Sequence, residues 1–120
     1  MKVEIEREAL DFILEASKNT YPNEFAAFLR EKSGRITEII FAPGVVFGRR
    51  GALLSRFLLP IDPSICGSVH SHPTSTKPSL ADLNFFSSFG KYHILVCFPF
   101  EMENVEVYSK KGKLLDFRVV

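Results

Sequence analysis

Tryptophan and glutamine are absent from this 120-residue chain, and cysteine occurs only twice. With Cys66 and Cys97 alone, no four-cysteine zinc site can form. Both cysteines lie in apolar, strand-like stretches, which favours buried thiols that pack as small hydrophobic groups. A disulfide, within the chain or between two copies, is the alternative. A low content of glutamine and asparagine is typical of proteins from heat-adapted organisms, so the composition favours such a source.

The chain also lacks an excess of charge and a long apolar run. Its formal net charge is +1, so no basic field indicates a nucleic-acid-binding protein. No apolar stretch approaches the roughly 20 residues that span a bilayer. The first eight residues carry too many charges for a secretory signal. We therefore expect a cytoplasmic protein without a membrane or nucleic-acid partner.

Apolar residues are numerous enough for one hydrophobic core. They make up 46% of the chain, and the mean hydropathy is +0.08, values that are typical of a globular protein rather than a disordered one. A length of 120 residues suits a single domain, so residues 1–120 are expected to fold as one unit.

The first half of the chain predicts one helix and three strands. Apolar residues recur at helical spacing over Ile5–Lys18, and Asn19 and Pro22 end the pattern because proline cannot donate a main-chain hydrogen bond. The predicted strands are Phe25–Arg30 and Arg35–Phe41, joined by a turn at Ser33-Gly34, and Leu53–Leu59 after a glycine-rich stretch.

The second half predicts a helix over Leu80–Phe89, which Gly90 stops, preceded by a loop over Thr74–Pro78. A near-continuous apolar run indicates a central strand. The predicted strands are Cys66–Ser71, Tyr92–Phe98, Asn104–Ser109 and Leu114–Val119, the last two joined by a hairpin at Lys111-Gly112-Lys113. The fold class is therefore α/β, an α+β mixed sheet with two helices.

The segment His70-Ser71-His72-Pro73 is the motif with the clearest chemistry. Side chains alternate along a strand, so His70 and His72 point to the same face. Histidines in strands are also found as ordinary hydrogen-bonded residues of a core or a surface. Asp82 follows in a predicted helix and can fold back toward them. Two imidazoles and one carboxylate form the ligand set of a catalytic zinc that keeps one position open for water.

The segment Ser79-Leu80-Ala81-Asp82 has a second interpretation, because it is also a capping-box pattern at the start of a helix. Both interpretations can hold at once, since a helix beginning at Ser79 would fix Asp82 in its first turn, where a ligand should be held. The hydroxyl of Ser79 could instead stabilise negative charge that develops on a reacting carbonyl.

Hydrolysis at such a site needs a general base. The chain has 14 acidic residues, most of them expected to be solvated surface charges. Glu24 stands apart because it precedes an apolar strand, at the sheet edge where sites form in α/β folds. The third histidine, His93, lies in an apolar run with no partner in register and is interpreted as structural.

Taken together, Glu24, the His-Ser-His-Pro segment and the Ser-x-x-Asp segment resemble the JAMM (MPN-plus) metalloprotease family over almost the whole chain. The resemblance implies a compact sheet flanked by helices, with one Zn²⁺ per chain and a catalytic water. By this resemblance the metal ligands are His70, His72 and Asp82, the general acid/base is Glu24 and the oxyanion donor is Ser79. Members cleave bonds that follow the C-terminal tail of ubiquitin or ubiquitin-like proteins.

The chain departs from the family pattern at two points. Six residues, Pro73–Pro78, separate His72 from Ser79, where members commonly have seven. Ala27 stands where a glycine is frequent, a mild replacement if its φ is negative. The large insertions of eukaryotic members are absent, so the chain is similar to archaeal or bacterial versions.

The resemblance implies a zinc-dependent isopeptidase that releases ubiquitin-like modifiers from their conjugates. One alternative is a peptidase that processes the C-terminus of a sulfur-carrier protein. Another is a non-catalytic scaffold that binds ubiquitin-like partners, although this chain retains all three ligands. The helix Leu80–Phe89 is a candidate docking surface for the modifier, unless its phenylalanines all pack inward. Homodimerisation stays open.

Overall fold

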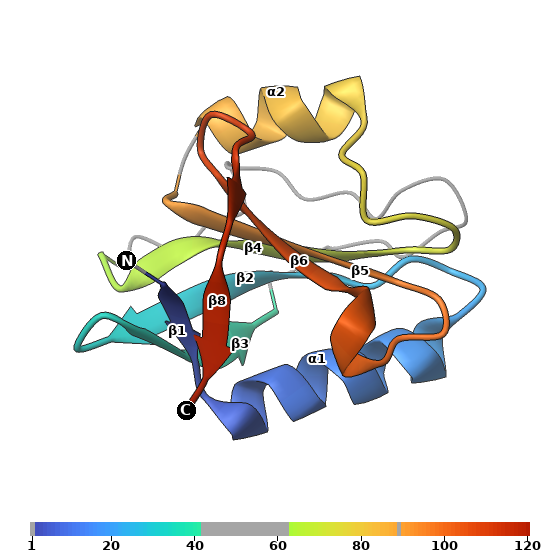
Figure 1. The fold of residues 1–120 in the computed structure, drawn as a ribbon, viewed down its shortest axis with the longest axis horizontal. Helices are drawn as coiled ribbons and strands as arrows, with labels where there is room; N and C mark the ends of the chain where they lie inside the picture. Colours follow the sequence, from blue (N-terminus) through green and yellow to red (C-terminus); the bar gives the residue numbers. More distant parts are fainter. Residues whose placement is uncertain (1, 42–62, 89) are drawn as a thin grey trace.

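The computed structural model describes residues 2–41, 63–88 and 90–120, which form an eight-stranded mixed sheet with two α-helices (Figure 1). A short 3₁₀ turn, Met102–Asn104, precedes one of the strands. The helices are α1, Arg7–Thr20, and α2, Leu80–Ser88. The strands are β1 Val3–Ile5, β2 Ala26–Lys32, β3 Arg35–Ile40, β4 Ile65–His72, β5 Tyr92–Cys97, β6 Val105–Ser109, β7 Leu114–Leu115 and β8 Phe117–Val119.

The strands follow the order β7-β6-β5-β4-β2-β3-β1-β8. β4 and β5 are parallel and are joined through α2, whereas β4 is antiparallel to β2. A parallel pair needs a crossover connection, and α2 supplies it. Because β4 has a strand on both sides, its side chains are held in register from two directions.

The two ends of this strand order are adjacent in the sequence. β7 and β8 lie at opposite ends of the sheet, yet Asp116 alone separates them. The main-chain carbonyl of Asp116 accepts a hydrogen bond from the amide of Val3 at 2.9 Å. The chain thus passes directly from one end of the sheet to the other, so the sheet must curl until its ends approach each other.

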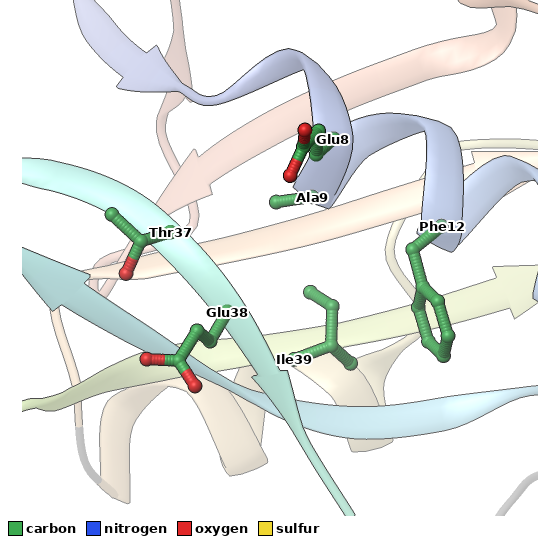
Figure 2. A pocket seen from close by; sticks show the side chains of 6 residues that line it. All are labelled: Glu8, Ala9, Phe12, Thr37, Glu38 and Ile39. Carbon is green, nitrogen blue, oxygen red and sulfur yellow. The ribbon is translucent and has the colours of Figure 1, made fainter.

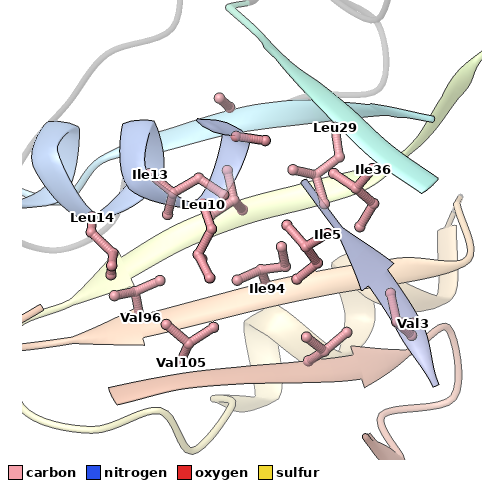
Figure 3. Packing of buried hydrophobic residues seen from close by; sticks show 14 of the residues in the cluster. Val3, Ile5, Leu10, Ile13, Leu14, Leu29, Ile36, Ile94, Val96 and Val105 are labelled. Carbon is pink, nitrogen blue, oxygen red and sulfur yellow. The ribbon is translucent and has the colours of Figure 1, made fainter. Parts of the chain in front are cut away.

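The hydrophobic core lies between α1 and the concave side of the curled sheet (Figure 3). Four apolar residues on one face of α1 are buried, at the spacing of an amphipathic helix. They pack against apolar side chains from β1, β2, β3, β4, β5 and β6. Complete burial of a side chain such as Ile13 contributes about 1.5–3 kcal/mol. A smaller cluster, Phe86, Leu95 and Tyr108, lies beneath α2.

The predicted mixed sheet, with one early helix and one after the histidines, is confirmed. The turn at Ser33-Gly34 is confirmed as well, with φ values of 55° and 77° at the two residues. The expected strand Leu53–Leu59 and the glycine-rich stretch before it lie outside the described residues.

Most predicted elements differ from the observed ones by one or two residues at an end, and two of the differences have a clear cause. The helix begins at Arg7, and Ile5 belongs to β1 instead. Ile5 lies four residues before Ala9, which is also the spacing of neighbouring residues on one face of a helix. This coincidence made a buried strand residue look like the first residue of the helix. The predicted strand Leu114–Val119 is divided at Asp116, because its first part pairs with β6 and its last part with β1.

The cysteines are free thiols, so the alternative of a disulfide within the chain is wrong. Cys66 is buried, as predicted, and Cys97 is partly exposed. Neither helix among the described residues is long and apolar enough to cross a membrane.

Candidate metal centre

The two histidines lie at the C-terminal end of β4, on the side of the sheet that α2 packs against. His70 pairs with Ala26 of β2 and with Leu95 of β5, and His72 pairs with Cys97 at the end of β5. His70 is buried and His72 is half-buried. As alternation along a strand requires, both imidazoles lie on one face. Phe85 of α2 packs on His70 with its ring edge to face, 5.9 Å between centroids.

The N-terminus of α2 holds Asp82 through a reciprocal pair of hydrogen bonds. The Ser79 amide donates to Oδ2 of Asp82 at 2.9 Å, and the Asp82 amide donates to Oγ of Ser79 at 3.1 Å. The predicted capping box is therefore confirmed. Such a cap satisfies main-chain donors that a helix start leaves without partners. It also fixes the direction in which the carboxylate points.

The carboxylate of Asp82 points at His72. Nε2 of His72 lies 3.2 Å from Oδ2 of Asp82. The other ring nitrogen, Nδ1, lies 3.1 Å from the carbonyl oxygen of Ser75. A carbonyl at one nitrogen fixes the ring orientation and so directs the second nitrogen toward Asp82. The sequence prediction that an acid on the following helix folds back to the histidines is met for this pair.

The electrostatics of the cluster favour an ionised Asp82 and a neutral His70. Burial alone would raise the pKa of Asp82, but the hydrogen bonds from His72 and the Ser79 amide and the charges of the histidines lower it to about 2. Burial lowers the pKa of His70 to about 4, against the attraction of Asp82. The hydrogen bond to Asp82 raises the pKa of His72. A carboxylate and an uncharged imidazole are the forms that bind metal ions.

One ring nitrogen of His70 indicates whether a metal ion fits at this cluster. Its Nδ1 is buried and has no hydrogen-bond partner within the described part of the chain. Buried polar atoms are normally paired, so an orphaned imidazole nitrogen beside a histidine–aspartate pair calls for an explanation. Two imidazoles and one carboxylate on one face suit zinc by their chemistry.

The side chains of His70, His72 and Asp82 do not yet have the geometry of a metal coordination sphere. Across residues 2–41, 63–88 and 90–120, no three His, Cys, Asp or Glu side chains already stand as a group that could hold an ion. His72 and Asp82 are in contact, and His70 lies within electrostatic range of both. Binding of an ion would therefore require side-chain rotation on a main chain that is already in register.

Glu24 is brought to the cluster by the pairing of β2 with β4. The amide of Phe25 donates to Oγ of Ser71 at 2.7 Å, and the amide of Ser71 donates to the carbonyl of Phe25 at 2.8 Å. Ser71 lies between the two histidines, so Glu24 is anchored one residue from that contact. Its negative charge contributes to the raised pKa of His72. Glu24 therefore lies within electrostatic range of the candidate ligands.

Ser79 is exposed at the start of α2, beside Asp82. Its oxygen accepts the Asp82 amide, which leaves its O–H hydrogen available to donate. The position is compatible with the predicted oxyanion donor, and that role stays a prediction.

His93 differs in one respect from the sequence interpretation. It is fully buried, as expected of a structural residue, but it does have a partner in register. Its Nδ1 lies 2.7 Å from Oγ of Ser68, and the ring of Phe86 stacks on it at 4.3 Å between centroids. His93 thus anchors α2 on the sheet. Ser71 and Tyr108 also escaped the sequence analysis, because alternation along the strand assigns no role to the residue between two histidines, and Tyr108 lies in no local pattern that marks a site.

The phenylalanines described on α2 pack inward. Phe86 is fully buried, and Phe85 is half-buried against His70 and His93. The large exposed apolar residues described on this helix are Leu80 and Leu83. An excess of outward-facing phenylalanine was the basis for expecting a docking surface here, and Phe85 and Phe86 do not supply it.

A separate pocket lies between α1 and β3 (Figure 2). It is lined by Glu8, Ala9, Phe12, Thr37, Glu38 and Ile39. None of the five candidate site residues lines it. The chemistry of the chain is therefore gathered at the ends of β4 and β5, not in this hollow.

The chain is similar to several known proteins, three of which follow. A protein named probable metalloprotease from Haloferax volcanii is 36% identical over 129 residues, covering 98% of this chain and 80% of the relative. A JAB1/MPN domain protein from Archaeoglobus fulgidus is 40% identical, with a TM-score of 0.79 over 100% of this chain and 99% of that one. A third structure, described as JAMM, a metalloprotease-like zinc site in the proteasome and signalosome, is 37% identical, with a TM-score of 0.77 and the same coverage. No protein-family model matches the chain.

Proposed function

The chain belongs to the JAB1/MPN metalloprotease family, and from that premise we propose that it is a zinc-dependent isopeptidase. It hydrolyses the bond that follows the C-terminal Gly-Gly of a ubiquitin-like modifier and so releases the modifier from its conjugate. The observation that carries this proposal is the contact of His72 with Asp82, to which the Phe25–Ser71 hydrogen bonds bring Glu24.

His70, His72 and Asp82 would hold one Zn²⁺. Two of the three ligands are favoured in the form that binds metal, because a neutral His70 and an ionised Asp82 need not lose a proton. Asp82 raises the pKa of His72, so a protonated His72 would release its proton when the ion binds. Zinc supplies Lewis-acid polarisation of a carbonyl group and of water. The protein contributes the fixed main chain of β4 and the cap of α2, which limit the movement of the ligands.

Glu24 is the proton carrier of the proposed reaction. Its carboxylate accepts the proton of the attacking water as the oxygen bonds to the carbonyl carbon. It then returns that proton to the amine nitrogen as the carbon–nitrogen bond breaks, so one carboxylic acid and one amine leave. Ser79 donates its hydroxyl hydrogen to the carbonyl oxygen while negative charge develops there.

The modifier as substrate rests on the family resemblance of the His-Ser-His-Pro and Ser-x-x-Asp segments. The position of the cluster supports it, because His72 and Ser79 lie where β4 ends and α2 begins and Ser79 is exposed. An extended tail can approach such an edge without displacing core residues. Glycine at the end of the tail offers the least bulk next to the capped helix start.

The experiment is incubation of the purified protein with two matched substrates. One is a ubiquitin-like modifier that ends in Gly-Gly and is joined to a lysine side chain. The other is the same modifier with a short C-terminal peptide extension. We expect cleavage of the lysine conjugate at the glycine carbonyl, its loss with a zinc chelator, and recovery when Zn²⁺ is restored.

The outcomes separate the alternatives. Cleavage of the extended modifier alone would replace the isopeptidase by a processing peptidase that uses the same site. Binding of the modifier without cleavage, in protein that contains zinc, would indicate a non-catalytic scaffold. Cleavage that resists the chelator would contradict the assignment of the metal.

A further inference from the structure

We propose that Tyr108, on β6, is a positioning residue for the metal centre. Its hydroxyl holds the loop between β4 and α2, residues 73–79, and through this loop it fixes the orientation of His72. The inference rests on the proposed function, because it assigns Tyr108 a role toward zinc bound at His70, His72 and Asp82.

Tyr108 reaches the loop from a distant part of the chain. Its hydroxyl donates to the carbonyl oxygen of Thr76 at 2.8 Å. The side chain is buried between the sheet and α2, with 9% of its surface exposed. A hydrogen bond from a buried side chain to a main-chain carbonyl restrains the path of the loop itself, not merely one side chain on it.

The restrained carbonyl stands next to the residue that orients His72. Ser75 precedes Thr76, and its carbonyl oxygen lies 3.1 Å from Nδ1 of His72. The hydroxyl of Ser75 also accepts the amide of Lys77 at 2.9 Å, which closes a turn around Thr76. Any shift of Thr76 therefore moves the carbonyl that sets the ring of His72, and with it the Nε2 that faces Asp82.

The ring of Tyr108 contacts the second segment that builds the centre. Phe86 of α2 lies 6.2 Å from Tyr108 between centroids, with the two rings nearly parallel. Phe86 stands one helical turn after Asp82, on the same side of the helix. Tyr108 thus supports the loop by its hydroxyl and the helix by its ring, and a substitution can remove the first contact without the second.

The length of the loop makes such a restraint necessary. Six residues, Pro73–Pro78, must connect the end of β4 to the cap of α2. Apart from its prolines and Thr76, this connection is exposed. Without an anchor, the loop would sample several conformations, and the Ser75 carbonyl would occupy several positions. Metal binding would then have to order the loop, and the lost conformational entropy would weaken the affinity for zinc.

The test compares Tyr108→Phe with the wild-type chain. Phenylalanine keeps the ring against Phe86 and removes only the hydroxyl. We expect zinc affinity, measured by competition with a chromophoric chelator, to fall about fivefold, the equivalent of one hydrogen bond of about 1 kcal/mol. The visible absorption bands of the Co²⁺-substituted protein should shift, because they report the ligand geometry directly.

The control is Tyr92→Phe, which removes a phenol close to Tyr108 in register but packed against the other core cluster, at the end of β5 away from His72 and Cys97. It should leave zinc affinity and the Co²⁺ spectrum unchanged. Melting temperatures of the metal-free proteins separate folding from metal binding. A Tyr108→Phe variant with wild-type zinc affinity would overturn the inference, whether or not its metal-free form melts earlier.

Failure of the inference and failure of the proposed function give different results. Wild-type protein that binds no zinc would overturn the proposed function and this role with it. Wild-type protein that binds zinc, beside a Tyr108→Phe variant that binds it equally well, would remove the role of Tyr108 alone.

Discussion

Ser71 and Phe25 are joined by two hydrogen bonds, one of them from the amide of Phe25 to the buried hydroxyl of Ser71 at 2.7 Å. Ser71 stands between the two candidate metal ligands of β4, and Phe25 follows the candidate general base. The distance from Glu24 to the histidines is therefore set by a contact that involves neither ligand nor base.

Removal of this hydroxyl should impair turnover more than metal binding. In Ser71→Ala the amide of Phe25 loses its side-chain acceptor, which should lower the unfolding free energy by about 1–3 kcal/mol. We expect kcat to fall about tenfold or more because Glu24 is less well placed. Isothermal zinc titration should show unchanged affinity. Ser87→Ala, on the exposed side of α2, is the control, and equal kcat values in the two variants would contradict the positioning of Glu24 by Ser71.

The Glu24→Gln variant should retain zinc and lose activity. The amide has the shape of the carboxylate but cannot take the proton of the attacking water, so kcat should fall by about 10²–10⁴-fold. Metal content by atomic emission should match the wild type. Glu8→Gln, in the pocket of Figure 2 away from the metal centre, should keep full activity. Wild-type turnover in Glu24→Gln would assign the proton transfer to another group.

Asp82→Asn should separate the two roles of Asp82. Asparagine can still accept the amide of Ser79, so the helix cap survives and the metal-free protein should still unfold in one cooperative transition. The lost charge should weaken zinc binding by more than about a hundredfold, the upper range for a residue that only supports a ligand. Unchanged zinc affinity would leave Asp82 as a capping residue alone.

The two cysteines should differ in reactivity. Burial raises the pKa of Cys66 to about 12, so at pH 8 the reactive thiolate is a minute fraction of the native population. Burial also raises the pKa of Cys97, but this thiol is partly exposed. Alkylation of the native protein, followed by mass spectrometry, should modify Cys97 first, and denaturant should make both reactive. Equal native rates would show that β4 opens readily.

Gly67→Ala should prevent the strand carrying the histidines from pairing. A Cβ at Gly67 would stand 1.5 Å from the carbonyl oxygen of Tyr92, so β4 and β5 would have to separate. We expect a loss of several kcal/mol, of the order of the larger overpacking penalties, or no folded protein. Gly34→Ala is the contrast, because its φ of +77° is strained for alanine but the surrounding space is open. It should cost only about 1 kcal/mol by thermal denaturation.

The parts of the site that sequence alone predicted are the local ones. Alternation along a strand places His70 and His72 on one face, and a capping box places Asp82 in a first turn, so each needs only a few residues of context. Glu24 is different, because its position depends on the pairing of Ala26 with His70. Its place before an apolar strand made it a candidate, and the order of residues in the family pattern indicated its role.

The contacts that the sequence did not predict depend on how strands distant in the sequence pair with one another. Ser68 and His93 meet because β4 and β5 are parallel neighbours, and Tyr108 reaches Thr76 across the sheet. No periodicity within one segment reports such a contact. A strand of three residues, β1, is likewise too short for alternation to distinguish it from the helix that follows.

The closure of the sheet has a consequence for how the chain is made. β1 obtains its second neighbour only when β8 exists, since Val3 pairs with Phe117. During translation the sheet must therefore stay open along its first strand until the last strand has left the ribosome. β2, which follows Glu24, and β4, which carries the histidines, are synthesised earlier, so they can pair before β8 joins the sheet.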